Sequence, residues 1–238
     1  MKREVFRPAT LAEREKYYKK EFSLKKIKRW FKVNKIEFPQ LCAIDAGTET
    51  GIIKDKKLKG EMLYFPFSKL EEKIRKYVPE DVYYDRNKYK NTKKALNNLE
   101  KKKFIMQELV FDIDCNNIKC NCEKKEKFCE KCLRKIYSWA LKLDKELRKI
   151  FKKTIIVYSG RGFHIHVFDK IAFLMNKKER KDLVKKFKNF PIDHWVSEGY
   201  IELIRLPYSL NGLVSRKVIP LESNKFKIKE TIPKFIMD

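Results

Sequence analysis

Apolar residues recur at helical spacing over several stretches of the chain. The clearest case lies in residues 131–152, where Leu133, Ile136 and Ala140 follow one another at three- and four-residue intervals. That interval places side chains on one face of a helix, as expected for a helix packed on a core. The pattern predicts helices over residues 9–36, 68–78, 86–104, 131–152 and 176–189.

Three shorter runs have the composition of β-strands. They are rich in β-branched and aromatic residues, and glycine or polar residues bound them, as at buried strands. They cover residues 107–114, Thr154–Tyr158 and 163–168. Helices and strands together predict one compact, mixed α/β domain. No linker composition interrupts the chain, so we expect a single domain over residues 1–238.

The chain has 238 residues, with 58 Lys and Arg against 32 Asp and Glu, and a formal net charge of +26. A surplus of this size favours nucleic-acid binding, because basic side chains release counterions from phosphates. A solvated lysine-rich surface would give the same composition. No apolar run reaches the ~18 residues of a membrane span, and the start of the sequence lacks the apolar segment of a secretory signal. We therefore expect an intracellular protein without a membrane partner.

Five of the six cysteines fall between Cys115 and Cys132. In an intracellular protein such clustering favours a metal site over disulfides. Four thiolates can close a tetrahedral zinc site, which is structural because no position stays open. The first half, C-x-C, is tighter than usual, so Cys115 stays an alternative ligand. The sequence predicts a zinc-binding insertion at about 115–133, with ligands Cys120, Cys122, Cys129 and Cys132.

Two carboxylates lie on the strand predicted at 107–114. Side chains alternate along a strand, so Asp112 and Asp114 share one face while Phe111 and Ile113 share the other. Carboxylates ~7 Å apart on one face repel each other unless a cation lies between them. Carboxylate oxygens suit Mg²⁺ or Mn²⁺, and such a pair can form part of a two-metal site for phosphoryl or nucleotidyl transfer. A bare D-x-D on a sheet edge is the alternative.

A second cluster of reactive side chains follows in residues 158–167, Y-S-G-R-G-F-H-I-H-V. Its glycines permit a tight turn that brings backbone N–H groups close to an anion. Arg161 can bind phosphate oxygens through two parallel hydrogen bonds. His164 and His166 lie on one strand face. A glycine hairpin with polar strand residues is the alternative.

A third cluster begins at Asp193, and the run R-L-P-Y-S-L-N follows at residues 205–211. Read in isolation, Asp193 is typical of a helix cap after Pro191, and the second run is typical of a turn.

In this order the motifs resemble those of the catalytic small subunit of archaeal and eukaryotic DNA primases. That family shows an FDID-type acid pair, a Cys-rich zinc knuckle, an S-G-R-G-x-H run, a late Asp and an R-x-P-x-S-[LV]-[HN]-like run. All of them occur here between Phe111 and Asn211. The resemblance is good over the C-terminal half of the chain and loose over the N-terminal half. It implies a primase-like catalytic core, with a central β-sheet flanked by helices and a zinc-knuckle insertion.

The resemblance also implies roles for individual residues. Asp112, Asp114 and Asp193 correspond to the three catalytic carboxylates that bind two Mg²⁺ or Mn²⁺ ions. The residues that contact the incoming nucleotide in the family correspond to Ser159, Arg161, His164, Arg205 and Asn211. The structural zinc ligands correspond to Cys120, Cys122, Cys129 and Cys132.

Several positions depart from the family pattern. Asn211 stands where the family usually has His, and the N-terminal arginine-containing motifs have no clear match. The segment between His166 and Asp193 is short, where family members commonly carry a helical insertion. These departures indicate a reduced catalytic core.

The implied function is a DNA primase catalytic subunit, a DNA-templated nucleotidyltransferase that makes short RNA primers for DNA replication. Its implied partners are single-stranded DNA template, an RNA/DNA heteroduplex, NTPs or dNTPs, and the large iron–sulfur subunit of primase. One alternative is a repair polymerase of the same superfamily. The other is a non-catalytic nucleic-acid-binding module on the primase fold.

Overall fold

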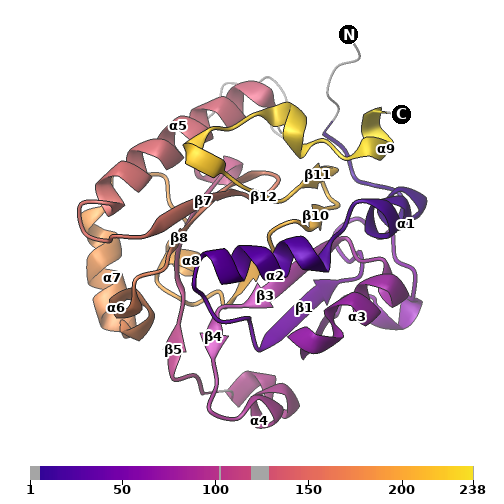
Figure 1. Cartoon of the computed structure of the whole chain (residues 1–238), viewed down its shortest axis with the longest axis horizontal. Helices are drawn as coiled ribbons and strands as arrows, with labels where there is room; N and C mark the ends of the chain where they lie inside the picture. Colours follow the sequence, from indigo (N-terminus) through magenta and orange to yellow (C-terminus); the bar gives the residue numbers. More distant parts are fainter. Residues whose placement is uncertain (1–5, 102, 119–128, 238) are drawn as a thin grey trace.

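The structure is a computed structural model that describes residues 6–101, 103–118 and 129–237. It confirms a mixed α/β fold, in which helices surround β-sheets (Figure 1). The helices are α1 (Leu11–Lys20), α2 (Leu24–Val33), α3 (Leu70–Tyr77), α4 (Thr92–Asn97), α5 (Glu130–Leu147), α6 (Lys170–Leu174), α7 (Lys177–Lys186), α8 (His194–Ser197) and α9 (Lys234–Met237).

Within the described residues, the larger strands divide between two sheets instead of forming one central sheet. The first sheet has the order β11-β10-β3-β1-β2, with β9 also paired to β3, and the second has the order β12-β7-β8-β6. A separate pair joins β4 and β5. The strands are β1 (Leu41–Asp45), β2 (Met62–Pro66), β3 (Asp81–Asp85), β4 (Asn87–Lys88), β5 (Met106–Gln107), β6 (Leu109–Asp114), β7 (Thr154–Tyr158), β8 (Gly162–Val167), β9 (Leu203–Arg205), β10 (Leu210–Asn211), β11 (Arg216–Lys217) and β12 (Ile219–Pro220).

Alternation along β6, β7 and β8 gives the second sheet two different faces. Phe111 of β6 and Ile165 of β8 point into a core that contains Leu133 and Leu143 of α5. Val110 of β6 and Val157 of β7 point the other way, into the core shared with the first sheet. Asp112 and Asp114 lie on the same face of β6 as Val110, so the fold places them between the two sheets.

The predicted helices over 131–152 and 176–189 are present as α5 and α7, although each is shorter than predicted. Residues 9–36 are largely helical as predicted, but as the two helices α1 and α2, because Ser23 caps the second by accepting the N–H of Lys26 at 3.3 Å. The prediction of a helix over 86–104 was only partly right: among the described residues of this segment, the α-helix α4 covers Thr92–Asn97 alone. This lysine-rich segment starts as β4, since Asn87 N–H binds Asp85 Oδ1 at 2.9 Å and Gln107 Nε2 binds Asn87 Oδ1 at 2.8 Å.

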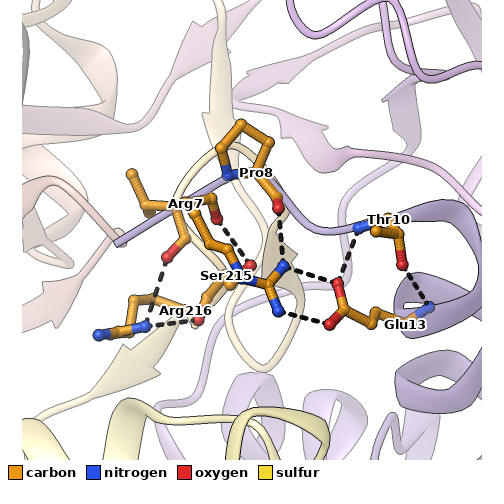
Figure 2. Close-up of polar contacts among 7 residues, drawn as sticks. Arg7, Pro8, Thr10, Glu13, Ser215 and Arg216 are labelled. Atoms are coloured by element: carbon orange, nitrogen blue, oxygen red, sulfur yellow. Dashed lines mark hydrogen bonds and ion pairs between the residues drawn. The ribbon is translucent and has the colours of Figure 1, made fainter. Parts of the chain in front are cut away.

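The N-terminal segment holds the hairpin of β10 and β11 in place (Figure 2). Ser215 Oγ donates to the carbonyl of Arg7 at 2.7 Å, and Ala9 N–H donates to the carbonyl of Gly212 at 2.7 Å. The guanidinium of Arg7 in turn binds both carboxylate oxygens of Glu13 in α1. These contacts fix the hairpin that carries Asn211. No helix within the described residues is both long and apolar enough to cross a membrane.

Candidate active site

The site is built around Asp112, which lies in the middle of β6 opposite His164 of β8. Its neighbours Phe111 and Ile113 are buried on the other face, which fixes the direction of the carboxylate. Asp112 Oδ1 is buried and accepts no hydrogen bond from any described residue. Burial raises the pKa of Asp112 well above its usual value, and the charges of Asp114 and Asp193 raise it further. The structure therefore brings three carboxylates within electrostatic range of one another.

Asp193 reaches the site from the loop after α7. Its N–H donates to the carbonyl of Asp112 at 2.8 Å, which ties the loop to β6. Its Oδ1 accepts the N–H groups of Trp195 and Val196 at 2.8 and 3.2 Å, so Asp193 is also the N-cap of α8. The interpretation of Asp193 as a helix cap is thus confirmed, and capping fixes this carboxylate beside the other two.

The chemistry of these residues fits a divalent cation. Three carboxylates without a counter-ion repel one another, and the buried Asp112 Oδ1 would gain a partner from a bound ion. An all-oxygen donor set suits Mg²⁺ or Mn²⁺. Across the described residues, however, no three His, Cys, Asp or Glu side chains are arranged to hold an ion without adjustment. Asp114 is itself engaged, since its Oδ1 accepts the N–H of Asn116 at 3.2 Å.

The turn between β7 and β8 lies beside the carboxylates and holds two of the predicted nucleotide contacts. Ser159 N–H donates to the carbonyl of Gly162 at 3.0 Å, and Gly160 has a φ of +106°. A Cβ on Gly160 would come within 2.5 Å of Asn211 Nδ2, which itself donates to the carbonyl of Ser159 at 3.0 Å. The predicted residues Ser159 and Asn211 are therefore in direct contact, with Asn211 fully buried.

Arg161 and His164 approach the acids from this turn and from β8. Arg161 Nη2 lies 3.8 Å from Asp114 Oδ1 and donates to Asn116 Oδ1 at 3.3 Å. His164 Nε2 lies 3.6 Å from Asp112 Oδ1. Burial lowers the pKa of His164 well below its ordinary value, and nearby positive charge lowers it further. His164 therefore stands beside Asp112 as a neutral imidazole.

Arg205 of β9 comes from the other sheet. Its Nε and Nη2 bind the two oxygens of Asp81 at 3.2 and 2.5 Å, and its guanidinium carbon lies 5.3 Å from the ring centroid of Tyr83. The positive charge of Arg205 lowers the pKa of both Asp112 and His164, so it acts on the same site. Asp81 was missed by the sequence reasoning. Alternation along residues 81–85 places Asp81 and Tyr83 on one face, but Arg205 is 124 positions away.

Comparisons with known proteins agree with this arrangement. The sequence pattern of the DNA primase small subunit family matches residues 111–194, which contain the three aspartates. An "uncharacterized DNA primase small subunit-like protein" of Archaeoglobus fulgidus is 37% identical over 257 residues, covering 97% of this chain and 92% of that protein. This chain belongs to the DNA primase small subunit family.

Other relatives in the family are longer than this chain. The DNA primase small subunit PriS of Pyrococcus furiosus is 29% identical, with 98% of this chain aligned to 68% of that protein. PriS of Pyrobaculum calidifontis is 33% identical, with 56% of this chain aligned to 45% of that protein. A solved structure of the polymerase domain of Mycobacterium tuberculosis ligase D in complex with DNA has a TM-score of 0.52 and 11% identity, covering 96% of this chain and 88% of that one. That likeness shows a shared fold.

His166 belongs to the core of this primase family member and not to the site. Its Nδ1 lies 2.6 Å from Glu108 Oε1 and 3.3 Å from the hydroxyl of Tyr84, which donates to Glu108 Oε2 at 2.8 Å. Its ring packs edge-on against Trp30 at a centroid distance of 5.9 Å. His164 and His166 share a strand face as predicted, but only His164 lies beside a predicted metal carboxylate.

The predicted zinc ligands are only partly within the described residues. Cys120 and Cys122 lie outside them. Cys129 and Cys132 lie at the start of α5 with their sulfur atoms 3.2 Å apart. Cys115 lies instead beside the acids, with its sulfur 3.5 Å from Arg161 Nη2. The zinc site and its ligand set remain predictions.

Proposed function

We propose that this chain is a DNA-templated nucleotidyltransferase that makes short RNA primers for DNA replication. The family and the fold are those of primase-type nucleotidyltransferases. The observation that carries the proposal is the convergence of Asp112, Asp114 and Asp193 along the C-terminal half of β6, with a buried Asp112 oxygen that has no partner among the described residues.

In this proposal each group has a defined task. Asp112, Asp114 and Asp193 hold two divalent ions, Mg²⁺ or Mn²⁺. Bound there, such ions supply activation of a primer 3′-hydroxyl and stabilisation of the leaving pyrophosphate. Asp193 is held in place by capping α8, so its side chain needs little rearrangement when an ion binds.

The basic side chains around the acids serve the triphosphate of the incoming nucleotide. Arg161 extends from the glycine turn with hydrogen-bond donors for phosphate oxygens, and Arg205 is oriented by Asp81. Neutral His164 can donate one hydrogen bond without adding charge. The backbone of the turn at Ser159 is set by Asn211. The surplus of positive charge over the whole chain binds the template and the heteroduplex through phosphates, without sequence readout.

The family also supports two wider proposals. One is a heterodimer with a primase large subunit that carries an iron–sulfur cluster. The other is an intracellular location, where template and NTPs are found. Both follow from the family alone.

The test is an unprimed extension assay on single-stranded DNA with labelled NTPs or dNTPs and Mg²⁺ or Mn²⁺. The wild type is compared with Asp112→Asn, and with Asp182→Asn as a control that removes an exposed carboxylate on α7. We expect short RNA products from the wild type and from Asp182→Asn, and none from Asp112→Asn.

Other outcomes separate the alternatives. Extension only with dNTPs on primed or gapped DNA would identify a repair polymerase. Products only after addition of the large subunit would identify a partner-dependent primase. Template binding without incorporation under all of these conditions would identify a non-catalytic module and contradict the proposal.

A further inference from the structure

Two large aromatic side chains are exposed directly after Asp193. Trp195 is 65% exposed and Tyr200 is 45% exposed, whereas Val196, the other large apolar side chain between them, is buried. Their rings lie 5.2 Å apart at an interplanar angle of 65°. We call these two side chains the Trp195–Tyr200 platform. Trp and Tyr combine a large apolar ring with a polar atom, which suits them to binding surfaces.

The backbone beneath the platform is rigid. Buried Arg86 donates from Nη2 to the carbonyl of Val196 at 2.9 Å and also to the carbonyl of Ile201. Buried Gln107 donates to the carbonyl of Gly199 at 3.2 Å. The N–H groups of Tyr200 and Ile201 both bind the carbonyl of Trp195, at 2.8 and 3.1 Å. The platform is therefore preorganised, which lowers the entropy cost of placing a ligand on it.

Positive charge lies next to the aromatic rings. Lys177, at the start of α7, places Nζ 4.8 Å from the ring centroid of Tyr200. Lys178 and Lys181 are exposed on the same helix. Exposed aromatic rings beside ammonium groups fit a ligand with a planar ring and a phosphate, because bases stack on aromatic faces and phosphates attract lysine.

The platform also has a fixed relation to the proposed metal site. The N–H of Trp195 is one of the two donors that Asp193 Oδ1 accepts. A nucleic-acid strand that passes over the carboxylates would therefore contact Trp195 at the edge of the site.

We propose that Trp195 and Tyr200 form a stacking site for a base of single-stranded nucleic acid as it enters or leaves the site at Asp193. The proposal rests on the proposed function for the identity of the strand, template or primer. Its test is a binding measurement that needs no catalysis, so the stacking site and the proposed function can fail separately.

Tryptophan fluorescence provides an intrinsic probe of this site. Trp30 is buried in the core and Trp139 lies half-buried on α5, whereas Trp195 is the exposed tryptophan. Intrinsic fluorescence is followed during titration with a twelve-residue oligo(dT) at low salt, and with inorganic tripolyphosphate as a probe of charge alone. Base stacking on Trp195 quenches its emission. We expect quenching by oligo(dT), little by tripolyphosphate, and no oligo(dT) quenching in Trp195→Phe.

Affinity is measured in parallel by fluorescence anisotropy of labelled oligo(dT). Trp195→Ala is expected to weaken binding at least about fivefold, while Trp195→Phe, which keeps a stacking ring, stays within about threefold of wild type. Ile150→Ala, which removes an exposed apolar side chain after α5, is the matched control and should leave affinity unchanged. Thermal melts show that each variant is folded, and Trp195→Phe carries the test if Trp195→Ala is not.

The proposal is overturned if Trp195→Ala binds oligo(dT) as tightly as wild type. It is also overturned if quenching persists in Trp195→Phe, or if the wild type does not bind oligo(dT). Intact quenching in a protein without polymerase activity would contradict the proposed function and leave the stacking site in place.

Discussion

Asp81→Asn breaks the ion pair that orients Arg205, and the burial of that pair determines how much stability is lost. Asp81 is fully buried and the side chain of Arg205 is 17% exposed. Both carboxylate oxygens are engaged, at 3.2 and 2.5 Å, and the hydroxyl of Tyr83 adds a third hydrogen bond at 3.2 Å. Asparagine keeps the volume of the side chain but removes the negative charge.

Removing one partner of a buried ion pair costs about 3–5 kcal/mol, because the other charge stays buried without compensation. Arg205 retains some exposure, so we expect the lower end, about 3 kcal/mol of unfolding free energy. In a chain of this length 1 kcal/mol shifts Tm by roughly 2–4 °C. Asp81→Asn should therefore lower Tm by about 6–12 °C.

The assay is thermal unfolding followed by circular dichroism. Glu71→Gln is the matched control: it breaks the Glu71–Arg75 pair on α3, which has a similar distance of 2.6 Å but exposed fractions of 48% and 74%. An exposed pair contributes about 0–1 kcal/mol, so Tm should change by less than about 4 °C. The double variant Asp81→Asn/Arg205→Gln should recover part of the loss, since neither charge then remains buried. Equal Tm changes in Asp81→Asn and Glu71→Gln would refute this reasoning.

Three further predictions concern pH, the glycine turn and zinc. Burial raises the pKa of Glu80 to about 7 from 4.5, so the folded chain keeps a proton that the unfolded chain releases, and stability falls as pH rises from about 4.5 to 7. Glu80→Gln should thus raise Tm relative to wild type more at pH 8 than at pH 5, and an equal difference at both pH values would contradict this. Gly160→Ala should destabilise the fold by at least about 1–3 kcal/mol in thermal melts, because its Cβ meets Asn211. Gly51 has a φ of +71° but open space around its Cβ position, so Gly51→Ala should lower the unfolding free energy less than Gly160→Ala. A larger loss in Gly51→Ala would contradict the close contact of Gly160 with Asn211. The purified chain should carry one zinc ion by elemental analysis and lose it in Cys129→Ser, whereas a zinc-free wild type with reduced thiols would exclude the site.

Local alternation predicted much of the site. The positions of Asp112, His164 and the glycine turn follow from period-two patterns within single strands, and these hold in β6 and β8. The cap role of Asp193 also follows from its local context. Such features depend on a few neighbouring residues, so a single sequence contains the necessary information.

Features that depend on distant segments could not be predicted. The Asp81–Arg205 pair joins β3 to β9, and nothing in either segment indicates the other. The segment 86–104 has helix-forming lysines and contains α4, but at its start the contacts of Asn87 with Asp85 and Gln107 outweigh that propensity and form β4. The division into two sheets likewise depends on pairings such as Asn211 with Asp81, which only the tertiary structure determines.

The central claim, that Asp112, Asp114 and Asp193 share divalent ions, is tested most directly by Mn²⁺ titration followed by electron paramagnetic resonance. Free Mn²⁺ gives a signal that bound Mn²⁺ loses, so the number of sites and their affinity are read without any enzymatic assay. The titration is run without nucleotide, because ATP itself binds Mn²⁺, on wild type, Asp112→Asn and the exposed control Asp182→Asn. We expect Mn²⁺ binding by wild type and Asp182→Asn that Asp112→Asn loses. Equal Mn²⁺ binding by Asp112→Asn and wild type would contradict the claim.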